Sequence, residues 1–184
     1  MYFRKPKTPV FSILVLLFTL LLSSIIQAKD KQIATPAPEF THHAAKDWIN
    51  SKPLTLESLK GKVVLLDFWT FECWNCYRSF PWLNALEKQF AEEDFQIIGV
   101  HSPEFKHEHD RKQVEAKIKE FELHHPVMMD NDFSYWKALN NRYWPAYYLI
   151  DKEGLVQGKF FGETHQGDSN AKAIEALIRQ LLAS

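Results

Sequence analysis

Apolar residues along this chain fall into short continuous runs separated by segments of helical periodicity. The clearest run covers residues 63–69 and is rich in β-branched and aromatic side chains, which is typical of a strand buried on both faces of a sheet. Residues 75–90 then place apolar side chains three and four positions apart, which predicts an amphipathic helix. A buried strand is therefore expected to lead directly into a helix, with only a short loop between them.

The rest of the chain continues this alternation. Asp110 is a suitable N-cap for a helix that extends to about residue 121, and residues 151–154 form a turn between two apolar runs, which indicates a hairpin. The order β-α-β-α-β-α-β-β-α predicts an α/β fold with helices on both faces of a mixed central sheet. The remaining strands are expected at residues 95–100, 126–129, 146–150 and 156–161, and the remaining helices at 135–139 and 171–182.

One acidic residue interrupts the apolar run at 63–69. Asp67 follows four apolar residues, and a carboxylate buried in such a strand has a raised pKa. Because a carboxylate with a raised pKa can accept a proton near neutral pH, Asp67 is a candidate general base. The alternative is an ordinary charge at a half-buried edge of the sheet.

Residues 1–28 have the pattern of an export signal. Basic residues at the N-terminus precede a mainly apolar segment at residues 10–26. Ala28 follows this segment as a possible cleavage position, just before several charged residues. The pattern fits a cleaved signal peptide, and the apolar segment is also just long enough to remain as a membrane anchor. In either case we expect residues 29–36 to form an extended tether and residues 37–184 to form a domain outside the cytoplasm.

The composition agrees with one globular domain of this kind. Hydrophobic residues make up 46% of the 184 positions and charged residues 24%, which is enough apolar material for a core. Removal of residues 1–28 would take away three basic residues and no acidic one, so the formal net charge would change from −1 to −4. A mildly acidic domain without a basic stripe makes nucleic acid an unsuitable partner.

The chain contains two cysteines, Cys73 and Cys76. A disulfide that closes so short a loop removes little conformational entropy from the unfolded chain, so the pair is better explained by chemistry than by stabilisation. One alternative is half of a structural zinc site, but such sites need four ligands and no second Cys-x-x-Cys follows. Another is a copper-binding or delivery module, because Cu(I) prefers thiolates, although no methionine-rich segment accompanies the pair.

Cys73 falls at the start of the predicted helix, directly after the buried strand. Unpaired backbone N–H groups and the positive end of the helix dipole stabilise a thiolate there, and cysteine pKa values at such sites fall from about 8.5 to between about 3.5 and 7.5. Cys76 lies one helical turn further on, within reach of a mixed disulfide at Cys73. We therefore expect Cys73 to be the nucleophile and Cys76 the resolving thiol.

Several motifs together resemble the thioredoxin superfamily. The strand containing Asp67, the Cys-x-x-Cys sequence and Pro81 five residues later match the thioredoxin active-site pattern. Residues 37–40 and 59–65 are similar to the exported TlpA/ResA-like branch. A more specific similarity, to the thioredoxin-like module of DipZ-type cytochrome c biogenesis and disulfide reductase proteins, is carried by the stretches DFWTFECWNC, GVHSPEF, DNDF and NRYWPAYYLID.

This resemblance implies a thioredoxin fold and roles for four residues. Cys73 and Cys76 match the redox pair, and Asp67 matches the buried acid behind the second cysteine. Pro145 matches the cis-proline loop that faces the disulfide. A cis bond at this position would free the preceding backbone to pair with a substrate strand.

Other residues near these motifs are weaker candidates. Trp74, between the cysteines, and Trp144, directly before Pro145, are expected on an exposed substrate-binding rim around the disulfide. His101 and Glu104 follow the second predicted strand, at the edge where the sites of α/β proteins gather. An ordinary surface loop explains these two residues better than a role in the site.

Two differences from thioredoxins bear on the chemistry. Glu72 precedes the first cysteine where thioredoxins carry tryptophan, and a nearby carboxylate opposes the formation of a thiolate. The residues between the cysteines are Trp-Asn rather than Gly-Pro. Because these two residues tune the redox potential, the potential and the reaction direction of thioredoxins are not assigned to this chain. The membrane electron-transfer part of DipZ-type proteins has no counterpart in this chain, so we expect a separate membrane electron donor.

These observations predict an extracytoplasmic thiol–disulfide oxidoreductase that acts on exported proteins as a reductase, in cytochrome c maturation or disulfide reduction. The disulfide itself would be the redox group, without a further cofactor or a metal, and only residues 10–26 would touch a membrane. The alternative is a thiol peroxidase of the peroxiredoxin type. Thr70-x-x-Cys73 matches half of that signature, but Leu66 stands where its proline is expected.

Overall fold

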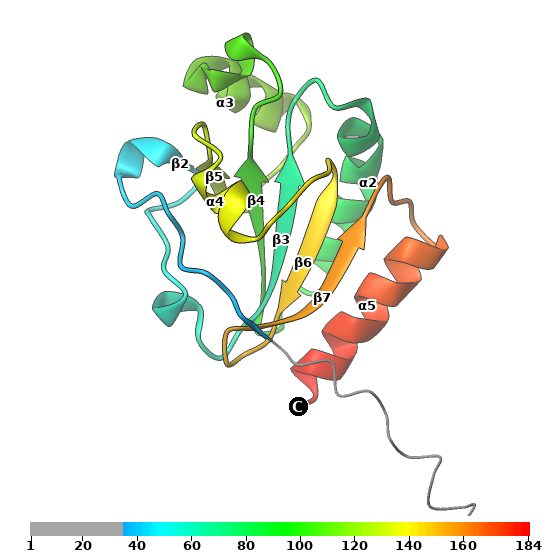
Figure 1. Cartoon of the computed structure of the whole chain (residues 1–184). Helices are drawn as coiled ribbons and strands as arrows, with labels where there is room; N and C mark the ends of the chain where they lie inside the picture. The colour runs from blue at the N-terminus through cyan, green and yellow to red at the C-terminus, as the bar shows by residue number, and fades with distance from the viewer. Residues whose placement is uncertain (1–34) are drawn as a thin grey trace, which may run out of the picture. The chain divides into compact units, whose positions relative to one another are not determined.

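The computed structural model describes residues 35–184, which form a seven-stranded mixed sheet (Figure 1). The strand order is β1-β7-β6-β3-β4-β5-β2. β3, β4 and β5 run parallel to one another, and every other neighbouring pair is antiparallel. The strands are β1 (Thr35–Pro36), β2 (Trp48–Ile49), β3 (Val63–Trp69), β4 (Phe95–His101), β5 (Val127–Met129), β6 (Ala146–Ile150) and β7 (Leu155–Phe161).

The helices begin at side-chain caps in several cases. Asp110 accepts a hydrogen bond from the backbone N–H of Lys112 at 2.9 Å, and Asp168 accepts one from Ala171 at 2.7 Å. These contacts satisfy donors that the first helical turn leaves unpaired. The α-helices are α2 (Trp74–Gln89), α3 (Arg111–Glu120), α4 (Ser134–Ala138) and α5 (Ser169–Leu182), and the short 3-10 helices are η1 (Ala45–Asp47), η2 (Glu57–Leu59) and η3 (Lys106–His109).

β3 lies at the centre of the sheet and all seven of its residues are buried. Because successive side chains of a strand point to opposite faces, β3 contributes to two separate cores. Leu65 and Trp69 pack with residues of α2, α3 and α5, whereas Leu66 and Phe68 pack with α4 and the segment before β3. The buried strand predicted at residues 63–69 is therefore confirmed, including its burial on both faces.

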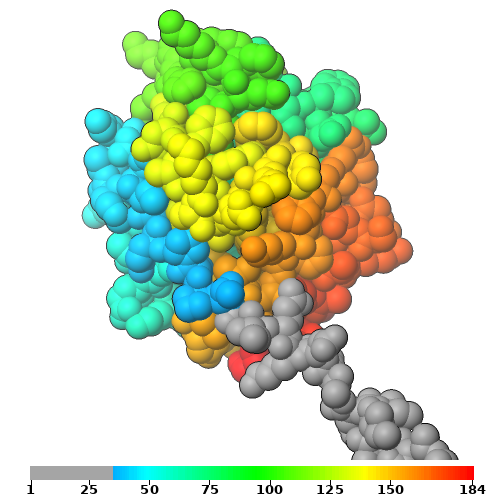
Figure 2. All heavy atoms as spheres, in the orientation of Figure 1, coloured from blue at the N-terminus to red at the C-terminus, as the bar shows by residue number. Residues whose placement is uncertain are grey.

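The segment before β3 covers one face of the sheet together with α4. Figure 2 shows this segment, in blue and cyan, beside the yellow region that contains α4. Phe40 and Trp48 are buried against Tyr135 of α4 in the same core. The imidazole Nε2 of His42 also lies 3.2 Å from a carboxylate oxygen of Asp130, which ties the two segments together.

The predicted α/β order is confirmed from β3 to α5, and the thioredoxin fold is correct. The structure adds β1 and β2, which hold two residues each. Thr35–Pro36, at the end of the expected tether, pairs with β7, and β2 pairs with β5. Strands of two residues are too short to show the alternation of apolar and polar positions from which a strand is predicted.

None of the helices in residues 35–184 is long and apolar enough to cross a membrane. The predicted signal peptide or anchor at residues 1–28 lies outside the described residues.

Candidate active site

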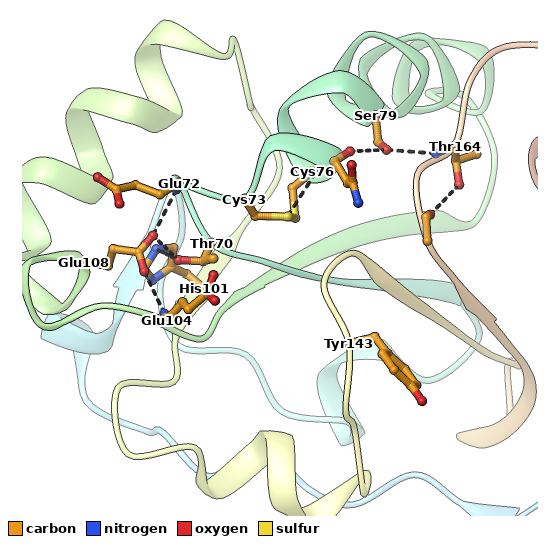
Figure 3. Close-up of a disulfide and its surroundings, with 12 residues drawn as sticks. Thr70, Glu72, Cys73, Cys76, Ser79, His101, Glu104, Glu108, Tyr143 and Thr164 are labelled. Carbon is orange, nitrogen blue, oxygen red and sulfur yellow. Dashed lines mark hydrogen bonds between the residues drawn. A yellow bond between two sulfur atoms is a disulfide. The ribbon is translucent and has the colours of Figure 1, made fainter.

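The two cysteines form a disulfide where β3 passes into α2 (Figure 3). Cys73 is the N-cap of α2, and its Sγ accepts a hydrogen bond from the backbone N–H of Cys76 at 3.1 Å. Cys73 is partly exposed, whereas Cys76 is only 1% exposed and packs in the core beneath α2. The geometry thus gives one sulfur access to solvent and keeps the other inside, as the assignment of nucleophile and resolving thiol requires.

Asp67 is fully buried in the centre of β3. It lies on the same face of the strand as Leu65 and Trp69, which is the face that α2 and Cys76 cover. Burial raises the pKa of Asp67 to about 8, and its Oδ2 has no hydrogen-bond partner within the described residues. The alternative of a half-buried edge charge is therefore wrong, and the side chain has the environment expected of a general base.

The loop before β6 contains the predicted proline. The peptide bond between Trp144 and Pro145 is cis. Trp74 is 65% exposed beside the disulfide, as expected. Trp144 is only partly exposed, contrary to expectation, because its ring packs on Trp136 with the ring centroids 4.3 Å apart.

The exposed aromatic residue of this loop is Tyr143, one position earlier. Its side chain is 57% exposed and lies on the loop that faces the disulfide (Figure 3). The sequence offered no way to choose between the adjacent Tyr143 and Trp144. In the structure, Trp136 of α4 packs against the indole of Trp144 and holds it inward, which leaves Tyr143 as the exposed residue.

A buried carboxylate that sequence analysis missed lies under the loop that carries Cys73. Glu108 of η3 accepts hydrogen bonds from the hydroxyl of Thr70 and from the backbone N–H of Glu72 at 3.0 Å. Its other oxygen accepts the backbone N–H groups of Glu104 and Phe105, both at 2.7 Å. Burial alone would raise the pKa of Glu108, but these hydrogen bonds outweigh it and hold the pKa below the usual range. Glu108 is therefore a charged group, and it holds both ends of the loop formed by residues 70–72.

His101 is buried next to this cluster, at the end of β4, and not in a surface loop as expected. Its Nε2 lies 3.5 Å from the hydroxyl oxygen of Thr70, and its ring packs against Trp69 and Phe71. Burial lowers the pKa of His101 to about 4, so the side chain is neutral at physiological pH. Glu104, in contrast, is exposed as expected and takes part through its backbone only.

The burial of Glu108 could not be read from its sequence surroundings. It lies within Lys106–Asp110, a run in which every side chain is polar or charged and which resembles a solvated loop. Its partner Thr70 is 38 positions away. The one available signal was the Thr70-x-x-Cys73 spacing, which drew attention to Thr70 for another reason.

Glu72 turns away from the disulfide toward η3. Its carboxylate Oε1 lies 2.7 Å from Nε2 of His107, and both side chains are about half exposed. The ring of His107 in turn packs against Phe71. All three residues of the loop before Cys73 are thus held by η3.

We expect Glu108→Gln to destabilise the protein by about 3 kcal/mol, because hydrogen bonds to a buried charge contribute about 1.5–3 kcal/mol each and an amide cannot accept all four donors. The backbone N–H of Glu72 should also exchange faster with deuterium. Because the folded-state pKa of Glu108 is lowered, its contribution is complete above about pH 5 and is lost as the pH falls through that pKa. Urea unfolding and amide exchange measure both effects.

Glu104→Gln is the matched control for this prediction. Its side chain is exposed and accepts no hydrogen bond within the described residues, so we expect a change of less than about 0.5 kcal/mol. Equal losses in the two variants would show that Glu108 has no special role in the loop.

A partly exposed cysteine at a helix N-terminus, a buried cysteine one turn inside and a buried acid on the face of the sheet that the helix covers are the features of thioredoxin-fold thiol–disulfide oxidoreductases. Comparison with known proteins identifies the family to which the chain belongs. A model of the AhpC/TSA family matches residues 33–159. The chain belongs to this family and, within the thioredoxin superfamily, to its TlpA/ResA-like branch.

Individual relatives agree with this placement. Protein DipZ of Mycobacterium tuberculosis is 41% identical over 138 residues, which are 73% of this chain and only 19% of DipZ. Thiol-disulfide oxidoreductase ResA of Bacillus cereus is 30% identical over 148 residues, or 79% of each chain. The solution structure of a thioredoxin-like protein in the oxidised form is 28% identical, with a TM-score of 0.69 over 83% of this chain and 97% of that one.

Proposed function

We propose that this protein is an extracytoplasmic thiol–disulfide oxidoreductase that reduces disulfides of exported proteins. The observation that carries the proposal is the contrast between the partly exposed Cys73 and the buried Cys76, which packs on the same face of the sheet as Asp67. The export pattern of residues 1–28 supports a location outside the cytoplasm. The similarity to ResA and DipZ supports the reaction and suggests cytochrome c maturation or disulfide reduction as its setting.

The reaction would proceed through a mixed disulfide. In the reduced protein, the Cys73 thiolate attacks a disulfide of the substrate, so that one substrate sulfur bonds to Cys73 and the other leaves as a thiolate. Asp67 accepts the proton of Cys76, whose thiolate then attacks Cys73 and releases the second substrate sulfur. The substrate leaves as a dithiol and the disulfide between Cys73 and Cys76 forms again.

Renewal of the dithiol requires two electrons from another protein. The proposal assigns this task to a separate membrane electron donor, and the two cysteines need no further cofactor. DipZ is much longer than the present chain, which covers 19% of it.

Thr70 bears on the alternative of a peroxidase. A peroxidase of the peroxiredoxin type would use this hydroxyl to orient a peroxide, but here the hydroxyl donates its hydrogen bond to Glu108. The two activities are distinguished by anaerobic insulin reduction and by peroxide consumption with the same reduced protein. Turnover of peroxide without insulin reduction would contradict the proposal, and a copper titration tests the metal-binding alternative.

The direction of the reaction is tested in the cell. We expect Cys73 and Cys76 to be mainly dithiol when free thiols are trapped with a mass-shifting reagent, because a reductase must be kept reduced by its donor. The control is the Cys73→Ser, Cys76→Ser double variant, which shows the mass of the unmodified chain. A mainly oxidised pair would mean that the protein acts as an oxidant.

A further inference from the structure

A groove begins at the nucleophile and leads away along the outer side of α2. Its first part has a volume of about 420 Å³ and includes Cys73 in its wall, with Trp74 and Tyr77 on the α2 side and Lys117 and Phe121 on the α3 side. The groove therefore lies between the start of α2 and the end of α3. Pro145 and Tyr143 are not among the residues that line it.

Aromatic side chains form the surface of this first part. The ring of Trp74 stacks on Tyr77 with centroids 5.3 Å apart, and Tyr77 contacts Phe121 at 5.4 Å. Trp74 and Tyr77 are two of the five large hydrophobic side chains that are exposed in residues 35–184, and both lie here. Phe121 is buried and fixed from below by Phe80, with centroids 5.0 Å apart, so the base of the groove is preformed.

A second hollow of about 590 Å³ lies beyond Tyr77. Tyr77, Glu120 and Phe121 line both hollows, so the two are adjacent. Lys117 and Glu120 pair at 2.8 Å along the rim, which leaves the rim polar without a strong net charge. An apolar base with a polar rim is the pattern of a protein-binding surface.

We propose that this groove binds the segment of the substrate protein next to its reactive cysteine and takes an aromatic or large apolar side chain onto Tyr77 and Phe121. The inference rests on the proposed function and names the substrate feature that the site selects. A substrate sulfur bonded to Cys73 fixes one point of the substrate chain at the head of the groove. An extended chain advances about 3.3 Å per residue, so residues two to four positions from the cysteine reach the aromatic base.

The test uses symmetric disulfides of short peptides that carry one cysteine each. In one series a single phenylalanine is placed two, three or four positions on either side of the cysteine, and in the reference peptide it is serine. Reduced Cys76→Ser protein reacts with each disulfide to give a Cys73–peptide disulfide and one free peptide thiol, and the rate of thiol release is measured. We expect the best phenylalanine peptide to react about tenfold faster than the serine peptide, because burial of an aromatic ring is strongly favourable.

Tyr77→Ser in the same background should reduce this preference to less than about twofold. Phe161→Ser is the matched control: Phe161 is also an exposed aromatic residue, but it does not line the groove, so the tenfold preference should remain. Equal unfolding midpoints in urea show that both variants are folded. Tyr77 is exposed at the helix surface, so its loss should not disturb the core.

The possible outcomes distinguish a failure of the groove proposal from a failure of the proposed function. If all peptides react and Tyr77→Ser leaves the preference unchanged, or if no preference exists, the groove proposal is overturned while the redox function stands. If no peptide disulfide reacts with Cys73, the proposed function fails. A dimer in sedimentation that dissociates in Tyr77→Ser, without a peptide preference, would assign the groove to a second copy and would also overturn the proposal.

Discussion

Replacing Asp67 with asparagine is expected to make the protein more stable. The folded-state pKa of Asp67 is about 8, compared with an ordinary value of 3.8. Between these pH values the folded protein keeps a proton that the unfolded chain has released, so wild-type stability falls as the pH rises from about 4 to 8. Each pKa unit corresponds to about 1.4 kcal/mol, and part of the gain is lost because a buried amide lacks partners. We expect Asp67→Asn to gain about 3 kcal/mol at pH 8, and the gain should disappear before the pH falls to 4, because the cost of the unpaired amide is the same at both pH values.

The same substitution is expected to slow the release of the mixed disulfide. Wild-type release should accelerate as the pH rises through about 8, where Asp67 becomes a carboxylate and can take the proton of Cys76. The variant should be slower by about 10²-fold at pH 8, at the lower end of general-base effects, and should recover as the pH rises further, because the Cys76 thiol also ionises unaided. Stopped-flow measurement of product release and urea unfolding between pH 4 and pH 8 test both effects.

Asp130→Asn is the control for the gain in stability. Asp130 is buried as deeply as Asp67, but its carboxylate accepts hydrogen bonds from Ser102, Tyr135 and Trp136. Its replacement should therefore destabilise the protein. If Asp67→Asn is also less stable than the wild type at pH 8, or releases its substrate at the wild-type rate at pH 8, Asp67 has a structural role only.

The second large effect is expected from the cysteines themselves. Cys73→Ser should reduce exchange by at least about 10³-fold and trap no substrate, because the accessible nucleophile is lost. Cys76→Ser should still attack and should accumulate mixed disulfides with exported proteins, because only the resolving thiol is missing. Non-reducing electrophoresis of both variants, with and without a reducing agent, shows the difference. Equal trapping by the two variants would contradict the assignment of roles.

The parts of the fold that sequence analysis predicted correctly depend on local patterns. The residues of β3 are apolar at almost every position because both faces of the strand are covered, and Asp110 caps the start of α3 with its side chain. Cys73 was recognisable because it follows a buried strand and precedes a helix. In each case the residues that determine the structure are neighbours in the chain.

The parts that were missed depend on partners that are distant in the sequence. Glu108 is buried because Thr70 and the backbone of Glu72 supply donors from another loop. Trp144 is held inward by Trp136, although its sequence position resembles that of the exposed Tyr143. No periodicity of apolar residues reports such contacts, since one polar or aromatic residue in a loop has the same local pattern whether it is buried or exposed.

The position of β1 has a consequence for how the domain presents its disulfide. Thr35 pairs with Val156 at the start of β7, and Lys152 in the adjacent turn donates hydrogen bonds to the carbonyls of Leu182 and Ser184. Both ends of the domain therefore lie at one pole of the sheet, whereas β3 delivers Cys73 to the other pole (Figure 1). If the domain were attached to a surface through its N-terminal end, the Sγ of Cys73 would lie on the side away from that surface. The reactive sulfur would then be accessible to proteins in the surrounding solution.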